Sequence, residues 1–345
     1  MMPVINQRPQ VNLARPTVLR MWLVFGCAAG TALYSALFDN FASLNVALFA
    51  LASGLSAEAL ALHFGKLRGQ NAAGVGAAGS TDGNSAAGRI ADGRIADGSA
   101  AASIMVLVLL LPHSINPLYA ALGAVFAMLL VKYSYGGLGA NWMNPALGAW
   151  LFIRFSWPAL FSAAQPAVSS GGALDTVLRN FLNRTVFTVT GAELPPGYVD
   201  LVLGTGNGGI IADRGLPVLI LGSILFMAVK INRAWIPGLY LVAYALLVRS
   251  FGALSTGGGF GEGDVLLCLC SGGTLAAAFL VVCDPVTGAK TPTGMLLTTI
   301  SAAFLAFLFR YPGGELYGAF PAAAMSNALV PLIRAAERCL PEDRK

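Results

Sequence analysis

The sequence predicts an all-α integral membrane protein with about ten transmembrane helices, arranged as two five-helix repeats that contain short or broken helices. Three observations support this prediction. Only 11% of the 345 residues are charged and 56% are hydrophobic, whereas a soluble domain has about 25% charged residues. About ten apolar runs approach the roughly 20 residues that a membrane span needs. Two of these runs, in opposite halves of the chain, resemble each other.

The expected spans form two groups of five. They lie near 19–38, 42–63, 100–112, 117–133 and 146–164, and then near 216–231, 235–252, 264–283, 295–310 and 318–334. The runs at 100–112 and 117–133 are short, and short or Gly/Pro-interrupted spans can be broken helices that line a site. DGSAAASIMVLVLLLP (97–112) echoes GDVLLCLCSGGTLAAAFLVVCDP (263–285), as a five-plus-five duplication would explain.

Two polar intervals divide the chain. The interval 64–99 is rich in Gly, Ala and Ser and repeats GRIAD, a composition that predicts a flexible loop. The interval 165–213 contains LDTVLRNFLNRTVF, whose apolar spacing indicates a helix on the membrane surface. The rest of the chain divides into four parts. They are the N-terminal segment with the first two spans (1–63), spans three to five (100–164), spans six to ten (214–335) and a cytoplasmic tail (336–345).

The distribution of Lys and Arg predicts the orientation. With ten spans, most of these residues fall in loops on the side of the N-terminus. Because cytoplasmic loops carry an excess of positive charge, we expect both termini and the loop 64–99 in the cytoplasm. The loop 165–213 is then extracytoplasmic. The net charge of +5 is therefore explained by the excess of Lys and Arg in the cytoplasmic loops. No nucleic-acid partner is expected.

The densest unusual stretch is YGGLGANWMNPALGAW (135–150) between spans four and five. Gly137 and Gly139 permit close approach of the backbone. Asn141 and Asn144 are three residues apart, so one helical turn would place both amides on one face. The stretch suits a planar heterocycle, or a cation bound by carbonyl groups. Alternatively, the asparagines cap helices and the glycines pack them.

Two further segments carry polar groups inside apolar runs. In CSGGTLAAAFLVVCDPVTGAKTPTG (270–294), Gly272 and Gly273 break a span and Asp284 follows at its cytoplasmic end. Asp284 either binds a ligand, lies on an ion path, or is simply solvated or capping. Glu58 lies inside LASGLSAEALALHF and is a candidate for an ion path, although it could also extend to the water.

The sequence excludes several kinds of chemistry. It has no Ser-His-Asp set, HExxH, Walker loop or CxxC, and only two histidines. Cys268 and Cys270 have the wrong spacing for a zinc or iron–sulfur site. We therefore predict no catalytic residues and no metal ligands in this chain. If the chain transfers electrons, its cofactor must be organic and held mostly by amides, hydroxyls and backbone groups.

Four segments, in this order, resemble a known family. They are DGSAAASIMVLVLLLPHSINPLY, VKYSYGGLGANWMNPALGAWLF, LCSGGTLAAAFLVVCDPVTGAKTPTG and GELYGAFPAAAMSNALVPLI. The chain resembles, over about residues 15–335, the D subunits of Rnf ion-translocating oxidoreductases and the homologous B subunits of sodium-pumping NADH:quinone oxidoreductases.

The resemblance implies a multi-pass subunit of a bacterial inner-membrane complex, with other membrane and peripheral subunits as partners. Such a complex moves electrons between NADH and ferredoxin, or to quinone, and couples them to Na⁺ or H⁺ transport. Catalysis belongs to the whole complex. In the family a second flavin, riboflavin, is associated with the membrane part. Asn141 and Asn144 match the asparagine pair near that flavin, and Asp284 matches the Asp-Pro motif. Riboflavin or noncovalent FMN is therefore expected here.

The resemblance also implies FMN linked to a threonine in the outer loop, and here the sequence departs from the family. The usual pattern is Asp-x-x-Ser/Thr-Gly-Ala-Thr. Phe187 stands in place of the Asp and Glu193 in place of the acceptor Thr. A carboxylate cannot accept the phosphoester that a hydroxyl forms, so we expect loss of covalent FMN. The alternative acceptors are Thr190, Thr188 and Thr185.

A different function fits the same broken helices. A stand-alone transporter or channel of five-plus-five type would need no redox cofactor. A bound chromophore and co-purifying partner subunits would favour the redox complex, whereas uptake by the isolated chain would favour the transporter.

Overall fold

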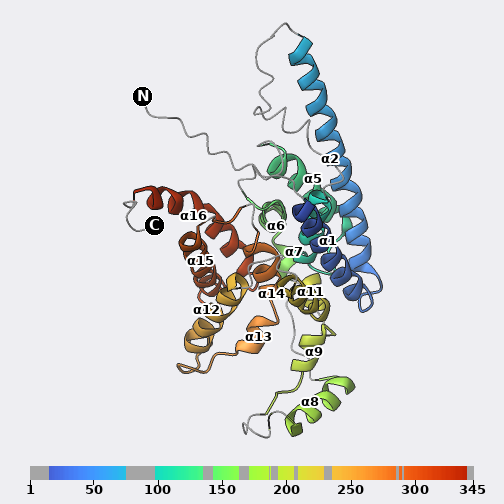
Figure 1. Cartoon of the computed structure of the whole chain (residues 1–345). Coiled ribbons are helices and arrows are strands. Elements are labelled where there is room, and N and C mark those ends of the chain that lie inside the picture. Colours follow the sequence, from blue (N-terminus) through green and yellow to red (C-terminus); the bar gives the residue numbers. More distant parts are fainter. Residues whose placement is uncertain are drawn as a thin grey trace.

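The computed structural model describes residues 15–74, 98–134, 143–162, 171–185, 187, 193–205, 209–228, 235–284, 287–289 and 291–339. These residues form helices and connecting turns (Figure 1). In this part of the chain the one extended pairing is an isolated bridge between Pro112 and Ile210. The prediction of an all-α membrane protein is confirmed.

The first half of the chain forms helices at each of its five expected spans. They are α1 (Arg15–Ala36), α2 (Ala42–Gly74), α4 (Ser99–Leu110), α5 (Pro117–Phe126) with the π-helix η2 (Ala127–Lys132), and α6 (Pro145–Ser156) with the short α7 (Ala159–Ser162). The helix α2 continues past residue 63, where the polar loop was expected to begin. The added residues include Leu, Lys, Arg, Gln and Ala, which are good helix formers. Figure 1 shows α2 extending beyond the rest of the bundle.

The second half repeats this order. It consists of α11 (Leu216–Ala228), α12 (Trp235–Phe251) followed by the 3₁₀ turn η4 (Gly252–Thr256), a broken segment, α15 (Pro292–Arg310) and α16 (Ala319–Cys339). The broken segment consists of α13 (Val265–Leu269), α14 (Thr274–Ala276) and the π-helix η5 (Ala277–Val282). Within the described residues, five helices are long and apolar enough to cross a membrane, and three further apolar helices are shorter.

The packing of the helices supports the expected duplication. In the first half, α2 packs against α4 and α5, and α6 packs against the same two helices. In the second half, α12 packs against the broken segment and α15, and α16 packs against α15 and η5. The helix α1 contacts α4 as α11 contacts α14, and α1 and α11 contact each other. Each of the five expected spans of the first half thus has a counterpart in the second.

The two halves have a shared apolar interior and a lipid-suited exterior. Almost every residue of α4 is buried, and Trp150 of α6 donates a hydrogen bond from its indole to the carbonyl of Leu110 over 3.0 Å. Large apolar side chains on the outer helices, such as Leu60, Val242 and Phe304, are exposed. Because lipid is as apolar as the interior, such surfaces are typical of membrane helices.

The described residues of the polar interval 165–213 form three short helices, the last of which ends one residue beyond it. They are α8 (Ala173–Thr185), α9 (Tyr198–Leu203) and α10 (Ile211–Arg214). The helix expected at 174–187 is therefore present, and Figure 1 shows α8 standing away from the bundle. Asp175 of α8 is buried and accepts backbone hydrogen bonds from Gly197 and Val199 at the start of α9. The Asp175 carboxylate therefore caps the N-terminus of α9 in place of a side chain from the N-cap residue. It also connects α8 with α9.

Candidate functional site

The two motif segments that the sequence singled out meet through Asn144 and Asp284. Asn144 is the N-cap of α6: its Oδ1 accepts the N–H of Ala146 over 2.9 Å, and Pro145 occupies the first helical position. Its Nδ2 donates to Asp284 Oδ2 over 3.1 Å. Asp284 directly follows the end of η5 and Cys283. The contact therefore joins positions 140 residues apart and links the two repeats.

Side chains from three further segments surround this contact. Thr287 donates to Asp284 Oδ2 over 3.1 Å, and Asn327 of α16 donates to Thr287 over 3.4 Å. Arg20 of α1 donates to the carbonyl of Cys283 over 3.2 Å. We call Arg20, Asn144, Asp284, Thr287 and Asn327 the amide–acid cluster. Arg20 and Asn327 were not predicted, although both are polar residues at the edge of, or inside, apolar runs.

The glycine pair of the broken segment has a different partner. Gly272 and Gly273 have φ angles of 70° and 71°, a left-handed conformation that favours glycine. Their N–H groups donate to the two carboxylate oxygens of Asp213 over 2.8 and 2.9 Å. A Cβ on Gly273 would lie 2.2 Å from the ring of Phe320. Asp213 was expected only as part of the polar loop. It accepts hydrogen bonds from the backbone N–H groups that the break in the helix would otherwise leave unpaired.

Arg310, the last residue of α15, reinforces the same break. It donates to the carbonyls of Cys268 and Ser271 over 3.1 and 2.9 Å, and to the Ser271 hydroxyl over 2.6 Å. These carbonyls lie at the end of the short α13 and just beyond it, where the backbone N–H partners of a helix run out, and the Thr274 hydroxyl also donates to both. The guanidinium group therefore neutralises the carbonyl side of the break, and Asp213 the N–H side.

The break and the amide–acid cluster lie at opposite ends of one span. Gly273 precedes α14 and Asp284 follows η5. The three residues of α14 and the six of η5 separate the two by roughly 10 Å or more. The structure brings Asn144 and Asp284 together, but it does not bring Gly272 and Gly273 to them.

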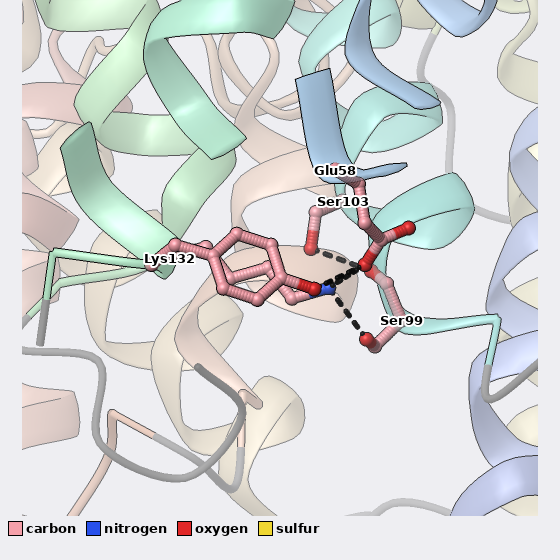
Figure 2. Close-up of polar contacts among 5 residues, drawn as sticks. Glu58, Ser99, Ser103 and Lys132 are labelled. Carbon is pink, nitrogen blue, oxygen red and sulfur yellow. Dashed lines mark hydrogen bonds and ion pairs between the residues drawn. The ribbon is translucent and has the colours of Figure 1, made fainter. Parts of the chain in front are cut away.

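Glu58 lies in a buried cluster that was not expected from the sequence. Its Oε1 accepts hydrogen bonds from Lys132 Nζ over 2.8 Å and from the Tyr133 hydroxyl over 2.6 Å. Lys132 also donates to the Ser99 hydroxyl over 2.8 Å. Figure 2 shows Glu58, Lys132 and Ser99 converging from α2, η2 and the start of α4. The Glu58 carboxyl group is buried and does not extend to the water.

The remaining candidates from the sequence are less informative. Asn141, Gly137, Gly139, Thr188 and Thr190 lie outside the described residues. Glu193 is exposed. The exposed hydroxyl of Thr185 donates to the carbonyl of Phe181 over 2.8 Å, one turn earlier in α8.

The chain is similar to known proteins over most of its length. The model of the NQR2, RnfD, RnfE family matches residues 4–339. The D subunit of the proton-translocating ferredoxin:NAD(+) oxidoreductase complex of Clostridium ljungdahlii is 29% identical over 242 residues, which cover 68% of this chain and 71% of the relative.

Two other relatives have related names. The D subunit of the Na(+)-translocating ferredoxin:NAD(+) oxidoreductase complex of Acetobacterium woodii is 28% identical over 245 residues, covering 68% of this chain and 70% of the relative. The D subunit of the ion-translocating oxidoreductase complex of Escherichia fergusonii is 28% identical over 366 aligned positions that cover 95% of each protein. Since the family model matches nearly the whole sequence, the chain belongs to the NQR2, RnfD, RnfE family.

Proposed function

We propose that this chain is a membrane subunit of an Rnf-type complex that couples electron transfer between NADH and ferredoxin, or quinone, to the transport of Na⁺ or H⁺. The observation that carries the proposal is the family match over residues 4–339. The names of the relatives support it, and they include both a proton- and a Na⁺-translocating complex. The partners are the other membrane and peripheral subunits, and the location is the bacterial inner membrane with both termini in the cytoplasm.

A noncovalent flavin, riboflavin or FMN, fits the amide–acid cluster. The cluster offers a guanidinium group, amides, a hydroxyl and a carboxylate, which together supply donors and acceptors for the polar edge of an isoalloxazine ring. The Asn144 amide has a second N–H besides the one donated to Asp284, and the Gly-rich stretch 135–142 precedes it. Arg20, Asn144, Asp284 and Thr287 would hold the flavin, which supplies one- and two-electron chemistry when bound.

Gly272 and Gly273 have a structural role and do not bind the flavin in this proposal. Their N–H groups already donate to Asp213, so these groups are not available to a ligand. We place the flavin at the amide–acid cluster, and we assign the glycine pair to the shape of the span.

The outer loop is proposed to have lost the phosphoester-linked FMN. Glu193, in the position of the acceptor threonine, carries no hydroxyl. Thr185 is a helical residue whose hydroxyl donates to Phe181. We expect the denatured polypeptide to show no flavin fluorescence on a gel. A fluorescent band whose labelled peptide lies within residues 185–193 would contradict this prediction.

The function is tested by purifying the tagged full-length chain from its native membranes in mild detergent. The expected result is a yellow preparation that contains the partner subunits and that NADH or reduced ferredoxin reduces. An unrelated membrane protein with the same tag is the control. A colourless chain that purifies alone, and that carries ions by itself in liposomes, would instead establish the stand-alone transporter.

A further inference from the structure

We propose that Glu58 is the binding site for the transported monovalent cation, and that the ammonium group of Lys132 is a tethered cation that occupies this site when the ion is absent. The inference rests on the ion transport proposed above. It adds the residue that holds the ion and the residue that competes with it.

The two oxygens of Glu58 differ in their hydrogen bonding. Oε1 accepts from both Lys132 and Tyr133, whereas Oε2 is buried and has no hydrogen-bond partner among the described residues. The whole residue is 1% exposed. A buried, unpartnered carboxylate oxygen is costly. It is also a free ligand position for a proton or for Na⁺, both of which prefer oxygen.

The Lys132 ammonium group has a second hydrogen-bond partner besides Glu58. Lys132 is the last residue of the π-helix η2, and π-helical turns are frequent at functional sites. Its Nζ already donates to Ser99 at the start of α4. A lysine stem is long and flexible. The ammonium group can therefore leave Glu58 and keep its hydrogen bond to Ser99.

In the second repeat, the counterpart of Lys132 is Arg310. Each is the last residue of a corresponding span, η2 or α15, and each is followed by a tyrosine. Lys132 donates to a serine at the start of α4, and Arg310 donates to Ser271 just before α14.

The two repeats use this position differently. Arg310 donates to two backbone carbonyls as well as to the Ser271 hydroxyl, and both oxygens of Asp213 accept backbone N–H groups. These partners cannot exchange without disrupting the broken segment. In the first repeat, by contrast, Lys132 and Glu58 are held by side chains. The exchangeable site is therefore at Glu58, and Arg310 is a fixed positive charge at the corresponding place in the second repeat.

The charges around Glu58 set the condition for exchange. The helix α2 packs against α1, α4, α5 and η2, and the described titratable groups that hydrogen-bond to Glu58 are Lys132 and Tyr133. Glu58 and Lys132 together are neutral. An incoming cation that displaces the ammonium group adds one positive charge to this neutral pair, and the electron carried in the proposed electron transfer would compensate it.

The test compares the assembled complex with and without this ion pair. Wild-type complex and the double variant Glu58→Gln/Lys132→Met are placed in liposomes, and redox-driven uptake of radioactive Na⁺ and of protons is measured together with electron transfer. A buried ion pair replaced by neutral groups of similar shape often leaves stability unchanged. We expect the double variant to assemble with its normal flavin content and to lose ion uptake to the level of empty liposomes.

The matched control removes the other ion pair of the described residues. Arg154 and Glu315 are bonded over 2.5 Å but are partly exposed. The variant Arg154→Met/Glu315→Gln should transport as the wild type does. Normal uptake by the Glu58/Lys132 double variant would mean that the pair only stabilises the fold, and it would overturn the inference. No uptake by the wild type would overturn the proposed transport function itself, and the inference with it.

A second measurement decides the matter if the double variant does not assemble. Carbodiimide, which modifies protonated carboxyl groups in apolar surroundings, is applied to the wild-type complex and to Lys132→Met, and the peptide containing Glu58 is analysed by mass spectrometry. We expect faster modification of Glu58 in Lys132→Met. Protection by Na⁺ identifies a Na⁺ site, and protection by rising pH alone identifies a proton site. Equal modification in both proteins, insensitive to Na⁺ and pH, would overturn the inference.

Discussion

Replacing Asp213 with Leu is expected to lower the free energy of unfolding by about 4 kcal/mol, because two buried hydrogen bonds to a charged group are lost at once. Gly272 and Gly273 would each keep an N–H group with no acceptor. Arg310 would also lose the nearby carboxylate. The measurement is the denaturant dependence of unfolding in mixed micelles, or the loss of monodisperse protein on heating if unfolding is irreversible.

Two control variants test whether the destabilisation comes from the lost acceptor oxygens of Asp213. Asp213→Asn keeps one acceptor oxygen, so its destabilisation should be intermediate. Ser223→Ala removes another buried polar group, but the Ser223 hydroxyl donates within its own helix to the carbonyl of Leu219, so its loss leaves no unpaired N–H. We expect a cost of less than about 1 kcal/mol. Equal stability of the wild type and Asp213→Leu would show that the broken segment does not depend on this carboxylate.

Replacing Asn144 with Ser is expected to remove most of the noncovalent flavin and to leave the fold intact. Serine is as good an N-cap as asparagine, so α6 should still begin correctly. The shorter side chain, however, cannot reach Asp284 as the amide does. The measurement is the flavin released by acid per purified chain.

The chain contains a matched control for this variant. Asn116 is also followed by proline and also caps its helix, α5, by accepting the N–H of Leu118 over 3.0 Å. It is exposed, and the side-chain hydrogen bond that it forms is to its own helix. Asn116→Ser should therefore keep its full flavin content. A flavin content in Asn144→Ser equal to that of Asn116→Ser would contradict the placement of the flavin.

The sequence was sufficient to predict the helices but not their polar partners. Apolar runs, prolines and glycines are local signals, so each of the ten expected spans is helical in the described residues, including the short and broken ones. The end of α2 was misplaced because the composition of 64–99 changes gradually and its first residues still favour a helix. Asn144 and Asp284 were selected individually, but their contact across 140 residues depends on the packing of two repeats.

The missed residues share one physical feature. Lys132 and Arg310 stand at the ends of expected spans and Asp213 ends the polar interval 165–213, and none of the three was given a role. The structure shows each of them turned to a helix terminus or an interior charge far along the chain. Lys132 and Glu58 are 74 residues apart. No local sequence pattern reports such a pairing.

The central claim, that the membrane-embedded amide–acid cluster holds a dissociable flavin, is tested most directly by the absorption spectrum of the purified full-length chain before and after acid precipitation. The account predicts flavin bands in the native protein that move entirely to the acid supernatant and leave a colourless pellet. A native preparation without flavin absorption would contradict it.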